Sequence, residues 1–194
     1  MTRMPFHAAI WTTACLSGLT ALSAHAAEPP DALRARGAYL VHSMSCADCH
    51  TPLKAGPQGP EPDLARGLSG HPSGQALKVP AASKGPWTWG GSDTNTAFWG
   101  PWGVSYAANL TPDETGLGPW TAAQFVQAMR TGKHAGSGRP IAPPMPWRGV
   151  GQLTESDLQA VFAYLKSQPA VRNVVPAYQP PTPSPTPSNG KPSP

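Results

Sequence analysis

Apolar residues recur at helical spacing near both ends of the chain. In residues 31–43, Leu40 and Val41 share one face with Gly37. Glycine inside a helix costs about 1 kcal/mol relative to alanine, so Gly37 predicts that another element approaches closely there. A second apolar stripe follows Thr154, a residue type that caps the start of a helix. Its positions at i, i+3, i+4 and i+7 are Leu158, Val161, Phe162 and Leu165.

Two more helices are predicted between these ends. A short helix fits residues 45–50. A longer one begins with Thr121 and Gln124, which form a capping-box pattern, and it ends at Gly132. The apolar face of this longer helix consists of Phe125, Val126 and Met129.

Residues 51–119 are different, because they are rich in glycine and proline and show little periodicity. This segment contains Trp87, Trp89, Trp99 and Trp102. Several aromatic residues in irregular chain indicate a loop that packs either against a large apolar group or against itself, and the sequence leaves both open. Since helices are the only regular elements that the pattern predicts, the expected fold class is all-α.

Composition divides the chain into three parts. Residues 1–26 have a basic start, an apolar run and a small-x-small end, which predicts a signal peptide cleaved after Ala26 and a periplasmic protein. A membrane anchor needs about 20 clean apolar residues, and Thr and Ser interrupt this run; a lipoprotein cut before Cys15 is the other alternative. Residues 27–176 would form the domain. Residues 177–194 are mostly Pro, Ser and Thr, which predicts a disordered tail.

The strongest chemical pattern is the run CADCH at residues 46–50. C-x-x-C-H is the attachment signal for c-type haem. The two thiols add to the haem vinyl groups as thioethers, and the adjacent imidazole ligates the iron. After signal cleavage Cys46 and Cys49 are the only cysteines left, because Cys15 lies in the signal peptide. The predicted cofactor is therefore one covalently attached haem c, held by Cys46, Cys49 and His50.

Other sites that use two nearby cysteines fit this sequence less well. A thioredoxin-like C-x-x-C follows a β-strand, whereas a helix pattern precedes residues 46–50. A zinc site needs two further ligands at a similar spacing, and His42, His71 and His134 are scattered along the chain. A structural disulfide would leave His50 unexplained.

With this motif the chain resembles a known family, the monohaem class I cytochromes c. Residues 36–40 (RGAYL) leading to 46–52 (CADCHTP) are similar to the opening of its periplasmic members. Residues 143–147 (PPMPW), followed by the helix over 154–165, are similar to their closing half. The cytochrome subunits of alcohol and gluconate dehydrogenases carry similar segments. The resemblance covers residues 31–176, and it implies a cytochrome c-like fold with crossed N- and C-terminal helices and long haem-wrapping loops.

The family also implies a sixth iron ligand, normally a methionine in a proline-containing loop before the last helix. Met145 matches that position, between Pro144 and Pro146. Besides an open site, the alternatives are Met129, Met44, His71 and His134. Of these, we expect the helical methionine in the core, Met44 too near the attachment site to cross the haem, and both histidines in solvent. Candidate partners of the haem propionates, each equally an ordinary loop residue, are Tyr106, Asn109, Trp147 and Arg148.

Ligation by His50 and Met145 predicts an electron carrier rather than an enzyme, because both axial positions of the iron would be filled. The expected donor is a dehydrogenase or quinol-oxidising complex, and the expected acceptor is an oxidase. One alternative is a five-coordinate haem enzyme or gas-binding protein. Another is a haem subunit of a membrane-bound dehydrogenase complex. The formal net charge of +4 gives no basic patch of the kind that nucleic-acid binding requires.

Overall fold

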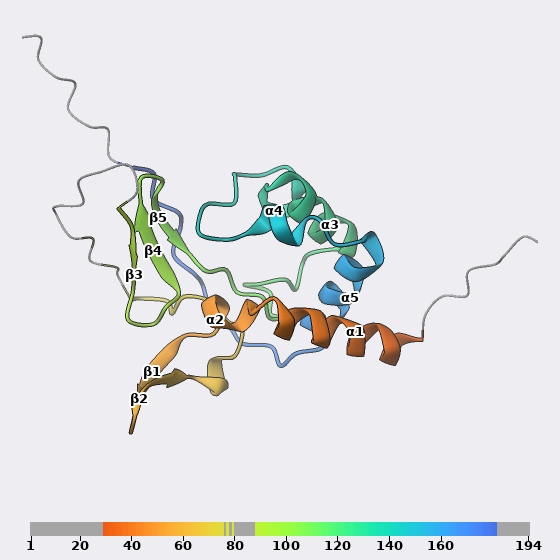
Figure 1. Cartoon of the computed structure of the whole chain (residues 1–194), viewed down its shortest axis with the longest axis horizontal. Coiled ribbons are helices and arrows are strands. Elements are labelled where there is room, and N and C mark those ends of the chain that lie inside the picture. The colour runs from red at the N-terminus through yellow and green to blue at the C-terminus, as the bar shows by residue number, and fades with distance from the viewer. Residues whose placement is uncertain (1–28, 76, 78, 80–87, 182–194) are drawn as a thin grey trace, which may run out of the picture.

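The computed structural model describes residues 29–75, 77, 79 and 88–181. The expected signal peptide of residues 1–26, Trp87 and the last part of the expected tail lie outside the described residues (Figure 1). In the part that is described, no helix is long and apolar enough to cross a membrane.

Helices build one half of the molecule (Figure 1). They are α1 (Pro30–Ser43), α2 (Cys46–His50), α3 (Ala122–Thr131), α4 (Trp147–Val150) and α5 (Glu155–Lys166). Two 3₁₀ turns add to them, at Leu64–Arg66 and His134–Gly136. The four predicted helices are confirmed. The pattern does not predict α4, which is a single turn and has no room for an apolar stripe.

The first and last helices, α1 and α5, pack directly on each other (Figure 1). Gly37 lies at the contact, and a Cβ atom on it would lie 2.0 Å from the backbone oxygen of Ala160. Beside it, Arg36 Nε donates to Asp157 Oδ1 at 2.8 Å, and this bond lowers the pKa of the Asp157 carboxyl group. The close approach predicted at Gly37 is therefore confirmed, since no side chain fits there.

The helix α3 completes the apolar core. Its capping box is present, because Gln124 N donates to Thr121 Oγ1 at 3.2 Å and Thr121 N donates to Gln124 Oε1 at 2.9 Å. The centroid of the Phe125 ring lies 5.5 Å from that of the Phe162 ring of α5. Each large apolar side chain buried here stabilises the fold by about 1.5–3 kcal/mol. Among the core residues are Leu40, Val41, Val126, Met129, Leu158, Val161 and Leu165.

Two small antiparallel sheets form the rest of the fold, so the all-α prediction is wrong and the domain is mixed α and β. β1 (Leu53–Gly56) pairs with β2 (Gly59–Pro62), and β4 (Ala97–Gly100) lies between β3 (Gly90–Gly91) and β5 (Gly103–Tyr106). The strands are two to four residues long, and β2 is exposed along its whole length. Strands this short, rich in glycine and proline, carry no clear period of two in the sequence.

The tryptophans of the second sheet pack on the sheet itself. Trp99 lies in β4 opposite Gly90 of β3. Trp102 lies in the turn between β4 and β5, and its Nε1 donates to Ser105 Oγ at 3.3 Å. Trp89 is 57% exposed. For Trp99 and Trp102 the structure supports the self-packed alternative, whereas the exposed Trp89 supports neither one.

After α5 the chain returns to this sheet. Val104 and Gln179 exchange both backbone hydrogen bonds, at 2.8 and 2.9 Å, and the Tyr178 hydroxyl donates to the Trp102 carbonyl. Gly103 has a φ of +96°, and a Cβ atom there would lie 2.0 Å from the Gln179 oxygen. The start of the predicted tail thus packs on the domain, while the disorder expected further on stays a prediction.

Candidate functional site

Both predicted attachment cysteines lie on α2. Ser45 has left-handed backbone angles (φ +53°) and turns the chain from α1 into α2. Cys46 and Cys49 follow at a spacing of three, which places them on one side of the helix. Both are half-buried free cysteines. Burial raises the pKa of each thiol, and the negative charge of Asp48 adds to the effect. The pair is therefore a set of two protonated thiols at one surface.

His50 ends the same helix and is 8% exposed. Its Nδ1 lies 2.8 Å from the carbonyl oxygen of Ala108. Because a carbonyl only accepts, Nδ1 must carry the proton, and the lone pair is on Nε2. Burial lowers the pKa of His50, although the bond to Ala108 opposes this. No other described residue hydrogen-bonds to the ring, so His50 is a neutral imidazole with one open nitrogen.

The Ala108 carbonyl is itself held in place. Residues 107–110 run beside residues 68–71. On either side of Ala108, His71 N donates to the Ala107 carbonyl at 2.9 Å and Leu110 N donates to the Leu68 carbonyl at 2.8 Å. Gly70 N also donates to the His50 carbonyl, at 2.8 Å. The Ala108 carbonyl is a functional group that the sequence does not reveal, since any residue type supplies a carbonyl and no pattern marks this one. A hydrogen bond of this kind sets the tautomer and orientation of a metal-binding histidine.

Met145 lies in the loop between α3 and α4, half-buried against the apolar core. Cys46 and Ala47 of α2 pack against the same core. The structure thus places the thiol-bearing helix and the Met145 loop at the border of one apolar cluster. Such surroundings suit a large apolar ring system.

Two of the rival sixth ligands are histidines, and the structure separates them. His71 is 1% exposed, so its predicted place in solvent is wrong. Its Nδ1 lies 2.8 Å from Thr96 Oγ1 and its Nε2 lies 2.9 Å from the Gln75 carbonyl, which leaves no nitrogen for a metal. His134 is exposed, as predicted, and its ring centroid lies 4.8 Å from that of Trp120, with the two rings nearly perpendicular.

The rival methionines have ordinary positions. Met129 is 7% exposed within the core, as its helical face predicts. Met44 is partly buried against the core, at the end of α1. Packing in or against the core explains the place of each, without a role as iron ligand.

The candidate propionate partners already have other contacts. Asn109 is buried, its amide nitrogen donates to Thr115 Oγ1 and to the Val171 carbonyl, and its Oδ1 accepts two bonds from Thr111. The guanidinium of Arg148 lies 4.5 Å above the ring of its neighbour Trp147. Of these residues, the exposed Arg148 retains the most freedom to meet an anion.

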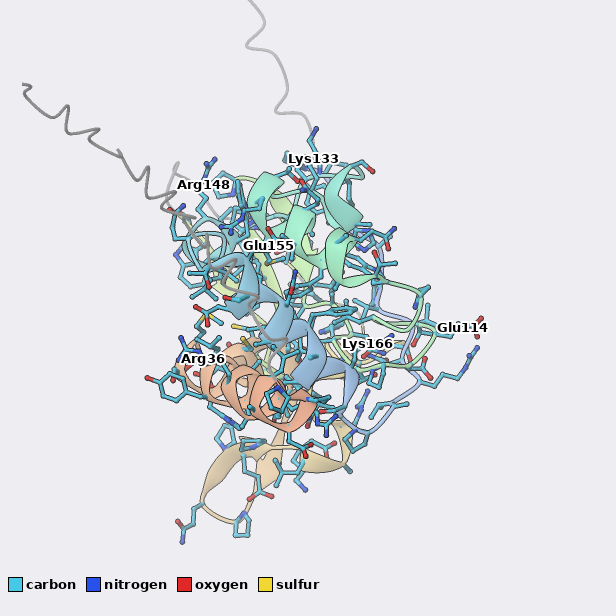
Figure 2. The ribbon with its side chains drawn as sticks, turned by 90° about the vertical axis from the view of Figure 1, so that its right-hand side faces the viewer. Arg36, Glu114, Lys133, Arg148, Glu155 and Lys166 are labelled. Atoms are coloured by element: carbon cyan, nitrogen blue, oxygen red, sulfur yellow. The ribbon has the colours of Figure 1, made fainter. Side chains whose placement is uncertain are left out.

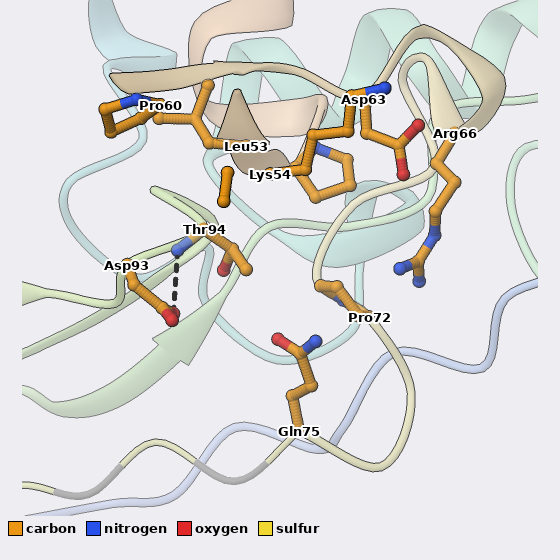
Figure 3. Close-up of a pocket in the computed structure, with 11 residues that line it drawn as sticks. Leu53, Lys54, Pro60, Asp63, Arg66, Pro72, Gln75, Asp93 and Thr94 are labelled. Carbon is orange, nitrogen blue, oxygen red and sulfur yellow. Dashed lines mark hydrogen bonds between the residues drawn. The ribbon is translucent and has the colours of Figure 1, made fainter. Parts of the chain in front are cut away.

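A cavity of about 380 Å³ opens beside the attachment segment, between the β1–β2 hairpin and residues 72–75 and 93–94 (Figure 3). Its lining includes both signs of charge, from Lys54, Asp63, Arg66 and Asp93. None of the four predicted haem-binding residues lines it, so it is separate from the candidate haem site.

Charge is unevenly distributed around the Met145 loop. Between Glu114 and Glu155 the sequence has no acidic residue. Figure 2 shows Lys133 and Arg148 at the end of the molecule that α3 and α4 form, with Glu114 well away from them. The exposed cations of this stretch are Arg130, Lys133, Arg139 and Arg148. The Met145 loop therefore lies in a positively charged region.

The donor set fits a covalent haem. Two free thiols lie on one face of α2, the adjacent imidazole has an open nitrogen, and a thioether borders the same core. A cluster of three or more His, Cys, Asp and Glu side chains that would suit a simple metal ion is absent from the described residues.

Comparison with known proteins identifies relatives of this chain. The chain is 28% identical over 158 residues to the cytochrome c subunit of alcohol dehydrogenase (quinone) from Gluconobacter oxydans, which is 79% of this chain and 26% of that protein. It is 30% identical over 135 residues to the cytochrome c subunit of gluconate 2-dehydrogenase from Pantoea cypripedii, 69% of this chain and 23% of that protein. The similarity supports a cytochrome c family.

A third relative is the cytochrome subunit of fructose dehydrogenase from Gluconobacter japonicus. It is 29% identical over 170 residues, 84% of this chain and 28% of that protein. This chain therefore spans 23% to 28% of the length of these three proteins. No protein-family model matches the chain. Similarity to cytochrome subunits of dehydrogenases implies haem c as the cofactor and is consistent with electron transfer.

Proposed function

We propose that this chain is a periplasmic electron carrier with one covalently attached haem c. Cys46 and Cys49 would form the two thioethers, His50 Nε2 would be the proximal ligand, and Met145 the sixth ligand. Export with cleavage after Ala26 belongs to the same proposal, because cytochromes that carry this motif mature outside the cytoplasm.

The observation that carries the proposal is the state of His50. Its Nδ1 donates to the Ala108 carbonyl while Nε2 is left open, and the same helix carries two free thiols. A hydrogen bond to the far nitrogen raises the basicity of the ligating one and fixes the ring. When bound, the haem would supply the one-electron redox change at its iron. The protein's own part is to hold the imidazole, anchor the ring edge and exclude water with the core.

Met145 is the sixth ligand that fits best. A soft thioether favours ferrous iron and raises the reduction potential. His71 has both ring nitrogens hydrogen-bonded, and Met129 is packed into the core. Of the alternatives, exposed His134 and an open site are left as competitors.

A dehydrogenase is the proposed redox partner, either as donor to a free carrier or as the complex that contains this chain. Support comes from the relatives, which are named as cytochrome subunits of dehydrogenases. The exposed cations around the Met145 loop would favour an acidic partner surface. The oxidase acceptor expected from the sequence has no support and stays a prediction.

A redox titration with optical spectra of the exported, haem-loaded full chain tests the proposal. We expect a single one-electron transition and, in the oxidised protein, the far-red charge-transfer band of sulfur-to-iron ligation. A high-spin spectrum that changes when carbon monoxide meets the reduced protein would instead support the five-coordinate enzyme or gas-binding alternative. Two transitions of equal size would contradict a single haem.

A further inference from the structure

The loop that delivers Met145 has very few anchors. Residues 142–145 are Ala-Pro-Pro-Met, and the two prolines have no N–H to donate. Within the described parts of the chain, one hydrogen bond reaches these four residues, from Ser105 Oγ to the Pro143 carbonyl at 2.5 Å. The flanking chain is tied down on both sides, by Ile141 N to Gly132 O at 2.8 Å and by Gly149 N to Pro146 O at 2.9 Å.

Ser105 is a rigid anchor. It lies on β5, is 8% exposed, and its Oγ accepts from Trp102 Nε1 at 3.3 Å. A serine hydroxyl has one hydrogen, and the Pro143 carbonyl is nearer than the Phe98 carbonyl at 3.4 Å. On its two sides β5 pairs with β4 and, at Val104, with the C-terminal segment.

We infer that Ser105 is a positioning residue for the Met145 ligand. It fixes the carbonyl two residues before the sulfur, and so keeps the thioether where it can ligate. This inference rests on the proposed function, in which Met145 binds iron. Without the Ser105 hydroxyl, residues 142–145 are held only at their two ends and by the packing of Met145 on the core. The chain between them then samples more conformations, and the sulfur leaves the iron more often.

The test uses the oxidised, haem-loaded full chain and measures the rate of cyanide binding, which requires that Met145 leave the iron. We expect Ser105→Ala to bind cyanide about 3- to 10-fold faster, the equivalent of one net hydrogen bond. The isosteric pair Ser105→Thr and Ser105→Val gives a second reading, since the two side chains have the same shape and only threonine has the hydroxyl. We expect the valine variant to react faster than the threonine variant.

The matched control is Ser92→Ala. Ser92 Oγ accepts from Thr96 N at 3.3 Å and from Ala97 N at 3.1 Å, so this change weakens the same sheet without touching the Pro143 carbonyl. We expect it to lower the free energy of unfolding and to leave the cyanide rate unchanged. An equal rise in rate in Ser92→Ala would show a general loosening of the sheet and overturn the role of Ser105.

The inference and the proposed function can fail separately. If the wild type shows the sulfur-to-iron band and Met145→Ala loses it, an unchanged cyanide rate in Ser105→Ala overturns the positioning role alone. If the wild type has no such band, the ligand assignment fails and the role of Ser105 falls with it.

Discussion

Two buried histidines, His50 and His71, lie in neighbouring segments of this molecule. They differ in how many of their ring nitrogens are hydrogen-bonded. His50 ends α2 and His71 follows in the loop that pairs with residues 107–110. Both rings are shielded from water, at 8% and 1% exposed, and burial lowers the pKa of both. The His50 ring makes one hydrogen bond, whereas the His71 ring makes two.

If His50 is the ligand that we propose, burial does not distinguish a ligand from a structural histidine. The two histidines differ in that only His50 has an open ring nitrogen. His71 links the Gln75 carbonyl to Thr96 of the second sheet and its ring packs 5.0 Å from that of Tyr106. The His71 ring therefore joins two segments through both of its nitrogens, while the His50 ring is bonded through Nδ1 and has Nε2 open.

The largest expected effect separates these two histidines by haem content. His50→Ala removes the proximal ligand, so we expect almost no protein with attached haem. His71→Ala should retain it. Mass spectrometry under denaturing conditions should show the wild-type chain plus one haem, as C-x-x-C-H attachment requires. A haem-free wild type from a maturation-competent host would contradict the proposed site.

The second prediction compares two methionines. Met145→Ala should abolish the sulfur-to-iron band, lower the reduction potential and open the iron to carbon monoxide, because it removes a ligand. Met129→Ala should leave the spectrum intact and cost about 2–5 kcal/mol of unfolding free energy, because it leaves a cavity in the core. Optical spectra and urea unfolding of both variants check this. The reverse pattern would make Met129 the ligand.

The third prediction concerns the structural role of His71. His71→Phe keeps a ring of similar size but removes the ring's hydrogen bonds to the buried Thr96 hydroxyl and to the Gln75 carbonyl, which together cost about 1–3 kcal/mol. We expect urea unfolding of the haem-loaded protein to show this loss of unfolding free energy. The optical spectrum of the haem should be unchanged. A changed axial-ligand spectrum would mean that His71 does reach the iron.

The fourth prediction is a pH dependence that depends on His71. Burial lowers its folded-state pKa, with Arg66 acting in the same direction and Asp93 and the Gln75 bond opposing. The unfolded chain therefore binds this proton first as pH falls below about 6.5. Stability should fall with decreasing pH, by at most about 1.4 kcal/mol per pH unit for this group, until the folded pKa is passed. Unfolding titrations between about pH 7 and pH 5 should show a shallower slope in His71→Phe.

The smallest expected effect concerns the C-terminal segment. A chain ending at Pro176 loses the Gln179 pairing with Val104, which makes two backbone hydrogen bonds. We expect a loss of about 1–2 kcal/mol of unfolding free energy. A chain ending at Pro181 retains this pairing and should match the full chain within error. An equal loss in both would mean that the stabilising contacts lie further along the tail.

The helical half of the fold could be predicted because its signals are local. Thr121 and Thr154 mark helix starts, apolar stripes mark the buried faces, and Gly37 marks the close approach between α1 and α5. The strands could not be predicted in this way. The sequence of β2 is Gly-Pro-Glu-Pro, which has low strand propensity and forms because its partner and turn hold it in place.

The candidate site likewise has a part that a local sequence pattern predicts and a part that distant segments supply. The run at residues 46–50 predicts the attachment residues because the chemistry needs a fixed local spacing. The Ala108 carbonyl and the Ser105 hydroxyl act from distant segments, and neither has a local pattern. His71 was expected in solvent because glycines surround it, yet it is buried where two distant segments meet.

The contact around Gly37 has a consequence for the order of folding. Arg36 and Asp157 are 121 positions apart, so the packing of α1 on α5 closes a loop that spans most of the domain. Contacts between residues this far apart slow folding, because the chain entropy of loop closure is lost before the contact energy is gained. During synthesis, α1 emerges long before α5 exists to cover it. The contact at Gly37 can therefore form only after almost the whole domain has been made.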